Sequence, residues 1–250
     1  MFIKPALIFT ISLLASASPF LRFDVVNTTL YSGSRHKTTL NDNPSSGNCS
    51  LPDDGTQKKG CQIVRNCVEE EQVAVTYDDG MFDYEGNIAK TFGNDSKATF
   101  FLNGNNFDCI YGYVEQVKAL FDAGHTLGSH GWSHKHMDQL SWDEINDELE
   151  RVEEAFIRIL GVKPKLFRPP YGDWNGLLLS ALSARNYTSM VLWDTDVEDG
   201  NGALEVAPYA VDRLRNSGYE LVDMDTCIGI EAGCAYEYVG KPAQKGDWSC

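Results

Sequence analysis

Short apolar runs rich in β-branched residues alternate with longer amphipathic stretches over residues 72–214. The run 72–77 (QVAVTY) ends in Asp-Asp-Gly, which is typical of a buried strand that enters a loop. The run 97–102 (KATFFL) predicts a second such strand, and an Asn-Gly-Asn-Asn turn cluster closes it. Residues 165–167 and 189–193 predict two further short strands.

Helical patterns occupy the stretches between these strands. Residues 113–123 carry apolar side chains at helical spacing. The segment 141–144 (SWDE) is a capping box, and it opens a helix that we expect to end at Gly161. A further helix is predicted at 177–184. This alternation favours an α/β barrel or a doubly wound sheet, in which functional residues follow the carboxyl ends of the strands.

The first residues have the order of regions found in a secretory signal peptide. Lys4 precedes an apolar stretch at 6–14, and Ala-Ser-Ala at 15–17 resembles a cleavage site. The alternative is a buried N-terminal helix. We therefore expect a signal peptide at 1–17, a flexible region rich in Ser, Thr, Asn and Gly at 18–60, and one folded domain at 61–250. The protein would then be secreted, outside the cell or in the cell wall.

Charge and cysteine content agree with an exported protein that does not bind nucleic acid. The formal net charge is -15, which makes nucleic acid and anionic membranes poor partners. The chain has 7 cysteines, so disulfides are expected after export and at least one thiol is left over, although the pairing stays open. The apolar stretch at 6–14 is too short to span a membrane, and no other stretch is long and apolar enough. Glycosylation sequons begin at Asn27, Asn48, Asn94 and Asn186.

Two histidines and two neighbouring carboxylates are candidates for a metal site. His130 and His134 are four residues apart, so both rings can face one ion on a helix or in a tight turn. Asp78 and Asp79 follow a predicted strand, and adjacent aspartates ionise together at little cost only beside a cation. If Asp79 binds the metal, Asp78 is available as a general base. Taken singly, the histidines are more commonly explained by core or surface positions, and Asp-Asp-Gly is better explained by an ordinary turn.

An arginine follows the third predicted strand, in a loop stiffened by two prolines. Arg168 precedes Pro169 and Pro170, and such a rigid loop can orient a catalytic carboxylate. The backbone N–H of Tyr171 is a candidate oxyanion donor. The alternative is a proline-rich turn with a surface arginine.

Together these segments resemble the polysaccharide deacetylases, the carbohydrate esterases with a NodB homology domain, and secreted fungal chitin deacetylases in particular. The residues that carry the resemblance are 77–80 (YDDG), 129–134 (SHGWSH) and 168–172 (RPPYG), supported by 98–106 (ATFFLNGNN) and 218–222 (GYELV). It covers roughly residues 67–229.

The resemblance implies a distorted (β/α) barrel of the NodB homology type, which removes N-acetyl groups from chitin or a related β-1,4 aminosugar polymer. By this resemblance Asp78 is the base, and Asp79, His130 and His134 bind a divalent metal, most often Zn²⁺, with Co²⁺ or another divalent ion as alternatives. Arg168 would orient the base, the Tyr171 amide would donate to the oxyanion, and Asp196 would hold the arginine. The catalytic residues would therefore be Asp78, Arg168, Tyr171 and Asp196. The resemblance also implies a Cys67–Cys227 disulfide, and the partner would be the polysaccharide, bound by a monomer.

The chain departs from the family pattern near residue 200. The family continues to a strand that ends in Leu-x-His, whose imidazole protonates the leaving amine, but this chain has no histidine after His136. Instead Gly202 leads directly into 204–214, which resembles the closing helix. We expect a barrel that is incomplete near residue 200 and an impaired activity. The chain is either a natural degenerate form, which alternatively only binds chitin or cell-wall carbohydrate, or the product of a skipped exon.

Overall fold

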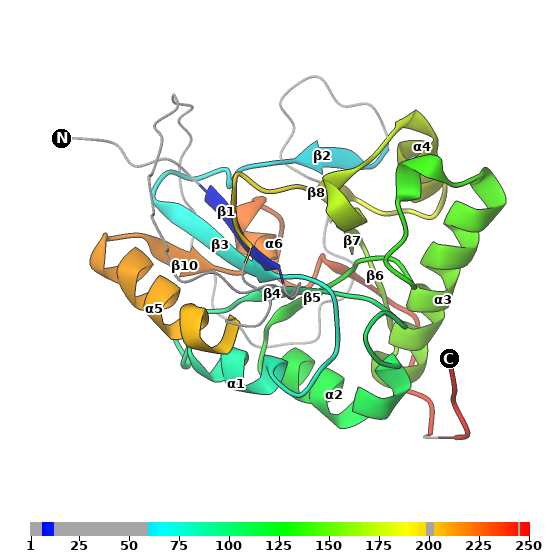
Figure 1. The fold of residues 1–250 in the computed structure, drawn as a ribbon, viewed down its shortest axis with the longest axis horizontal. Helices are drawn as coiled ribbons and strands as arrows, with labels where there is room; N and C mark the ends of the chain where they lie inside the picture. The colour runs from blue at the N-terminus through cyan, green and yellow to red at the C-terminus, as the bar shows by residue number, and fades with distance from the viewer. Residues whose placement is uncertain (1–6, 13–59, 199–202, 245) are drawn as a thin grey trace.

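The computed structural model describes residues 7–12, 60–198, 203–244 and 246–250, and for 7–12 and 195–198 it describes the backbone alone. A curved sheet of parallel strands forms the centre, and helices pack around its outside (Figure 1). The expected distorted (β/α) barrel is confirmed, in the form of an open, curled sheet. Residues 13–59, which include most of the expected N-terminal region, lie outside the described residues.

The main sheet has nine strands in the order β2-β8-β7-β5-β4-β3-β1-β9, with β10 also paired to β3. All its pairs are parallel. The strands are β1 (Leu7–Ser12), β2 (Gln62–Val64), β3 (Gln72–Tyr77), β4 (Thr99–Leu102), β5 (Thr126–Ser129), β7 (Leu166–Phe167), β8 (Ser189–Val191), β9 (Thr195–Glu198) and β10 (Glu220–Val222). A separate antiparallel pair joins β6 (Val162–Pro164) to β11 (Tyr236–Tyr238).

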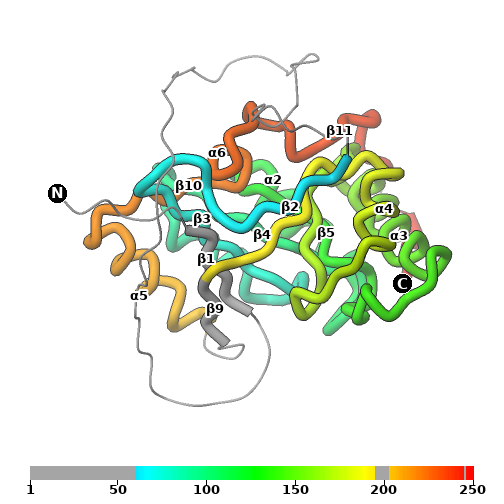
Figure 2. Tube along the Cα trace, turned by 90° about the horizontal axis from the view of Figure 1, so that it is seen from above, coloured from blue at the N-terminus to red at the C-terminus, as the bar shows by residue number. Residues whose placement is uncertain are grey.

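Six α-helices are present among the described residues. They are α1 (Glu85–Lys90), α2 (Val114–Asp122), α3 (Trp142–Leu160), α4 (Gly176–Ala184), α5 (Ala203–Asn216) and α6 (Met224–Cys227). Figure 2 shows α3 and α4 together at one side of the curled sheet and α5 at the opposite side. No helix in the described part of the chain is long and apolar enough to cross a membrane.

The ends of α3 follow the sequence signals. The side chain of Ser141 accepts a hydrogen bond from the Glu144 amide, and Glu144 reaches back to the Ser141 amide, so the expected capping box is present. Gly161 ends the helix with φ 77°, a left-handed conformation that glycine adopts at low cost. The face with Ile145 and Leu149 is buried, which anchors the helix against the sheet.

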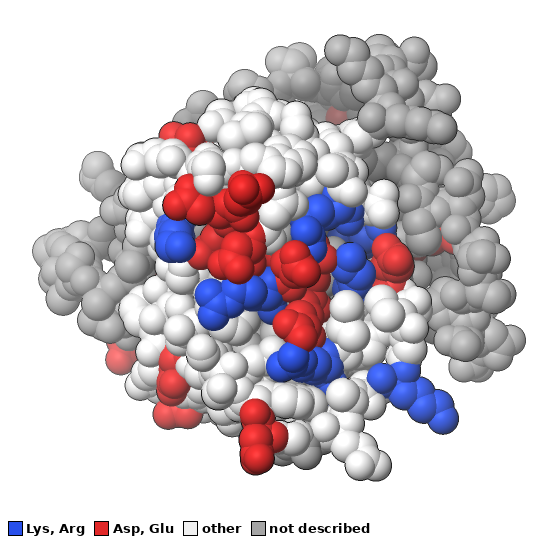
Figure 3. All heavy atoms as spheres, turned by 90° about the vertical axis from the view of Figure 1, so that its right-hand side faces the viewer, with Lys and Arg blue, Asp and Glu red and all other residues white. Residues whose placement is uncertain are grey.

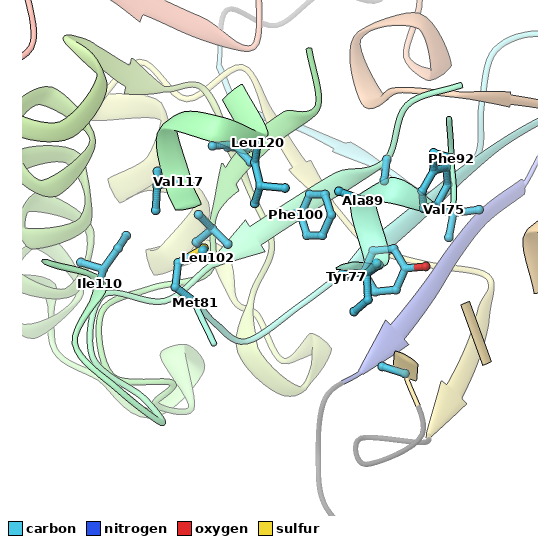
Figure 4. Close-up of a cluster of buried hydrophobic side chains, with 14 of the residues drawn as sticks. Val75, Tyr77, Met81, Ala89, Phe92, Phe100, Leu102, Ile110, Val117 and Leu120 are labelled. Carbon is cyan, nitrogen blue, oxygen red and sulfur yellow. The ribbon is translucent and has the colours of Figure 1, made fainter. Parts of the chain in front are cut away.

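The main core lies between the sheet and helices α1, α2, α3 and α5. All six residues of β3 are buried, as expected for a strand covered on both faces. Tyr77 of β3 stacks on Phe100 of β4 with ring centroids 5.3 Å apart (Figure 4). Val117 and Leu120 of α2 close this cluster from the helix side.

The face of the molecule with α3 and α4 carries acidic and basic side chains side by side (Figure 3). Arg185 joins the two helices through Glu153, with 2.8 Å between its Nε and the carboxylate, and Lys163 contacts the same carboxylate at 3.0 Å. Arg158 pairs with Glu154 one turn away. This face therefore carries mixed charge, with Arg185 and Lys163 both paired to the buried carboxylate of Glu153.

Near residue 200 the sheet differs from a closed barrel. Among the described residues, β9 pairs with β1 alone, and β1 lies between β9 and β3. Residues 199–202 lie outside the described part, and α5 follows at Ala203. The apolar segment expected to belong to a signal peptide thus forms a strand of the sheet, while the expected removal of residues 1–17 stays a prediction.

Among the described residues, two disulfides connect distant parts of the chain. Cys67 is bonded to Cys227, the pair implied by the family resemblance, and Cys109 is bonded to Cys250. Cys61 is a free thiol, and burial raises its pKa to about 12. The first bridge joins the segment before β3 to the end of α6, so it holds the two ends of the domain together.

Replacing Cys67 and Cys227 together by serine should destabilise the protein by about 4–5 kcal/mol, because the bridge closes a loop with a sequence separation of 160. Urea titration should show a lower midpoint. Replacing Cys61 by alanine is the matched control, since no disulfide is lost, and it should shift the midpoint far less. Equal shifts for both variants would contradict the expectation.

His125 should make the fold sensitive to mild acid. Burial, followed by the charge of Lys97, lowers its pKa from 6.5 to about 4, and its Nδ1 accepts a hydrogen bond from the Ala98 amide at 3.1 Å. As pH falls below 6.5, His125 becomes protonated in the unfolded chain but stays neutral in the folded protein. The free energy of unfolding therefore falls. Urea midpoints between pH 7 and 5 should decline less in His125→Gln than in the original protein. Parallel declines would show that His125 is not responsible.

Candidate active site and metal centre

Three loops bring the candidate residues together at one edge of the sheet. Asp78 and Asp79 follow β3, His130 follows β5, and Arg168 follows β7. Because these strands are parallel, their carboxyl ends meet at the same edge. The backbone N–H of Arg168 donates to Ser129 O at 2.9 Å, which fixes the spacing of two of the loops.

Asp79, His130 and His134 form a group with the donors of a metal site. Oδ1 of Asp79 lies 2.9 Å from Nε2 of His134 and 3.7 Å from Nε2 of His130. One ligand atom from each residue lies within 4.8 Å of the others. Two imidazoles and one carboxylate suit Zn²⁺ and other divalent ions, and Asp79 and His130 are buried. The residues therefore fit a divalent metal.

The orientation of the His130 ring suits a metal ligand. Its Nδ1 lies 2.8 Å from the carbonyl oxygen of Arg168, which can only accept a hydrogen bond. Nδ1 therefore carries the proton, and the lone pair of Nε2 faces Asp79. Burial lowers the pKa of His130 below its ordinary value, which favours the neutral ring that a metal requires.

The backbone is strained at the site. Five non-glycine residues with positive φ are found in the described part of the chain, and three of them are Asp79 (87°), His134 (56°) and Tyr171 (62°). Side chains disfavour this region, so each such residue costs roughly 1–3 kcal/mol that the surrounding structure must supply. Strain of this kind, gathered at one edge of the sheet, indicates a functional constraint on these loops.

Arg168 is 0% exposed and holds Asp78. Its Nη1 donates to Oδ1 of Asp78 at 2.8 Å and to the hydroxyl of Thr76 at 2.6 Å. Nε donates to the Val191 carbonyl at 3.2 Å, and the guanidinium lies 4.2 Å over the ring of Phe101. The structure thus brings Arg168 and Asp78 together, as expected for an arginine that orients a base. Asp196 lies in β9, and its side chain lies outside the described residues.

Two buried side chains that the sequence analysis did not single out support the histidine loop. Glu148 of α3 accepts from the Ser133 amide at 2.8 Å, from the Ser133 hydroxyl at 2.6 Å and from Lys135 at 3.1 Å. The side-chain amide of Asn103 donates to the carbonyl of His130 at 2.6 Å, and the backbone N–H of Asn103 donates to the carbonyl of Asp79. Glu148 lies on the apolar face of α3 beside Leu149, and a charge at such a position is the signal that could have revealed it.

Two further histidines in the described part of the chain, His125 and His136, lie outside the trio of Asp79, His130 and His134. His136 is exposed, stacks on the ring of Tyr171 with centroids 3.9 Å apart, and contacts Asp173 at 3.1 Å. With Asp138 and Asp173 it forms a second, more exposed group of metal-type donors. His125 is buried against Phe100. Neither joins the trio.

Comparison with known proteins identifies relatives over much of the chain. A family model described as polysaccharide deacetylase matches residues 65–190. A chitin deacetylase of Pestalotiopsis sp is 39% identical over 126 residues, which are 50% of this chain and 42% of the relative. A chitin deacetylase of Arthroderma benhamiae is 30% identical over 174 residues, 68% of this chain and 43% of the relative. The chain thus spans less than half the length of either relative.

The fold is similar to that of a solved chitin deacetylase from Colletotrichum lindemuthianum. The two structures superpose with a TM-score of 0.65 at 23% identity, over 71% of this chain and 96% of the other. At this identity the likeness concerns the fold, and it agrees with the curled sheet described above.

Titration with Zn²⁺ should show one tight site per chain. His134→Ala should weaken binding by about 10-fold or more, because one of three protein donors is lost. His136→Ala is the matched control, since this exposed histidine lies outside the trio. The affinity of this variant for Zn²⁺ should equal that of the original protein. Calorimetry on protein first treated with a chelator measures both. An equal loss in the two variants would place the ion elsewhere.

Proposed function

Because the chain belongs to the polysaccharide deacetylase family, we propose that it is a metal-dependent hydrolase that removes N-acetyl groups from chitin or a related β-1,4 aminosugar polymer. One observation carries the proposal. The group Asp79, His130 and His134 lies directly beside Asp78, and Asp78 is held by a fully buried arginine. A donor set for an ion, next to an oriented carboxylate, is the arrangement that metal-assisted hydrolysis of an amide requires.

Asp79, His130 and His134 would hold the metal, and the donor set favours Zn²⁺, with Co²⁺ as an alternative. The ion would supply Lewis acidity to the acetyl carbonyl and make water a better nucleophile. The protein would contribute the neutral form and fixed ring of His130, which the Arg168 carbonyl orients.

Asp78 would act as general base by taking the proton of the attacking water on its carboxylate. The guanidinium of Arg168 pairs with this buried carboxylate, and the hydrogen bond to Thr76 fixes the guanidinium. We assign Arg168 to orienting Asp78, and Asp196 to supporting the arginine from β9, in line with the family pattern.

The Tyr171 amide would stabilise the oxyanion that forms when water adds to the acetyl carbon. Pro169 and Pro170 have no N–H, so Tyr171 supplies the first backbone donor after Arg168. Its φ of 62° sets the direction of the following peptide, and its ring packs 4.6 Å from the ring of His134.

Departure of the amine is the step for which the chain lacks the residue that the family pattern uses. The family pattern protonates this amine with a histidine near the C-terminal end, and the sequence has none after His136. Loss of one general acid typically lowers a rate by roughly 10²–10⁴-fold. The same absence favours a second candidate function, in which the chain binds chitin or cell-wall carbohydrate without turnover.

The disulfides fit an extracellular protein, since such bonds persist in oxidising compartments. We propose that the protein works as a secreted monomer on the polysaccharide outside the cell or in the cell wall.

Incubation with chitooligosaccharides should release acetate slowly. A chelator should abolish the release and added Zn²⁺ should restore it. Asp78→Asn should lower the rate by roughly 10²–10⁴-fold while Zn²⁺ affinity stays close to the original, because the variant loses the base and keeps the trio. Enzymatic acetate assay and metal titration measure the two effects. Release that survives both treatments would contradict the mechanism.

Binding without turnover would separate the two candidate functions. Retention on chitin that depends on metal, with no acetate formed by the original protein, would select the carbohydrate-binding function. Acetate release at a rate that falls in Asp78→Asn would select the deacetylase.

A further inference from the structure

β1 (Leu7–Ser12) covers an edge of β3 with which no other strand of the described residues pairs. Along β3, β10 pairs with Gln72–Ala74 and β4 pairs with Thr76 and Tyr77. β1 pairs with Val73 to Tyr77 and so overlaps both registers. A strand has two edges, hence β4 and β10 share one edge of β3 and β1 covers the other.

The second strand that pairs with β1 is β9, and β9 depends on this pairing more strongly than β3 does. β9 pairs with β1 from Phe9↔Thr195 to Ser12↔Glu198, and within the described ranges it pairs with no other strand. Figure 1 shows β1 lying along β3 inside the curled sheet. β1 is therefore the connection between the strand that leads to Asp78 and the strand that contains Asp196.

The sequence of this segment suits a central parallel strand. Residues 7–12 (LIFTIS) have no charge, Gly or Pro and are rich in Ile, Phe and Thr. Parallel strands covered on both faces have such continuous apolar runs. An unoccupied slot would leave the N–H and C=O groups along β3 and β9 without partners, which is costly in a buried sheet.

We propose that the space between β3 and β9 is an acceptor site for one extended apolar peptide in parallel orientation, and that Leu7–Ser12 is the donor strand that occupies it. The donor strand pairs as far as Ile11↔Tyr77, the residue before Asp78, and as Thr10↔Asp196 on the other side. It thus joins β9 to the rest of the sheet. The proposal therefore concerns the chain before the expected removal of residues 1–17, and this removal would empty the site and release β9 from the sheet.

Hydrogen exchange on the full chain tests the proposal directly. In protein of residues 1–250 produced without removal of its N-terminus, the amides of Leu7–Ser12 should exchange at least about 100-fold more slowly than in the denatured chain. Exchange at the rate of an unstructured peptide would overturn the proposal. The measurement does not depend on metal or turnover, so its outcome is independent of the proposed function.

A proline in the middle of the donor strand is the second test. Thr10 pairs with both neighbours, and Thr10→Pro removes a ladder hydrogen bond and its N–H. Peptides covering Thr195–Glu198 should then exchange about 10-fold faster or more, and the melting temperature should fall by several degrees. Thr10→Val is the matched control, since valine keeps the strand, and it should behave as the original protein. Equal exchange in the two variants would overturn the proposal; if Thr10→Pro does not fold, the exchange of Leu7–Ser12 in the unsubstituted chain decides.

Discussion

Arg168 carries a permanent charge at a place that water does not reach, and the surrounding strands are arranged to satisfy it. The carboxylate of Asp78 and the hydroxyl of Thr76 come from the end of β3, and the carbonyl of Val191 comes from the end of β8. A buried charge that loses its partner typically costs roughly 3–5 kcal/mol. This cost ties the register of the parallel strands to the position of Asp78, so the fold and the candidate base depend on the same contacts.

The sequence predicted best those elements whose signals are local. The capping box at 141–144 and the glycine at 161 define α3, and the apolar run 72–77 coincides with β3. Proximity of Asp79, His130 and His134 was also predictable, because carboxyl ends of parallel strands share one edge. Residue type alone identifies the donor atoms, so the candidate metal ligands could be predicted without knowing the backbone conformation.

Contacts between distant segments were not predictable in the same way. Residues 7–12 have the composition of an export signal and equally that of a buried parallel strand, and no local signal in the sequence predicts their register with β3 and β9. The sequence does not predict the positive φ of Asp79 or His134, since neither residue is a glycine. The Cys109–Cys250 bridge depends on where the chain end lies, which spacing does not determine.

Glu148 connects the histidine loop to a helix on the outside of the molecule. Stability is not uniform in a protein, and helices at the periphery open locally at a lower free energy than a central sheet unfolds. When the first half of α3 opens, Ser133 and Lys135 lose their common anchor, and His134 is no longer held against Asp79. If the trio binds a metal ion as proposed, its occupancy would report on the packing of α3, because local opening of this helix would release the ion while the sheet stays folded.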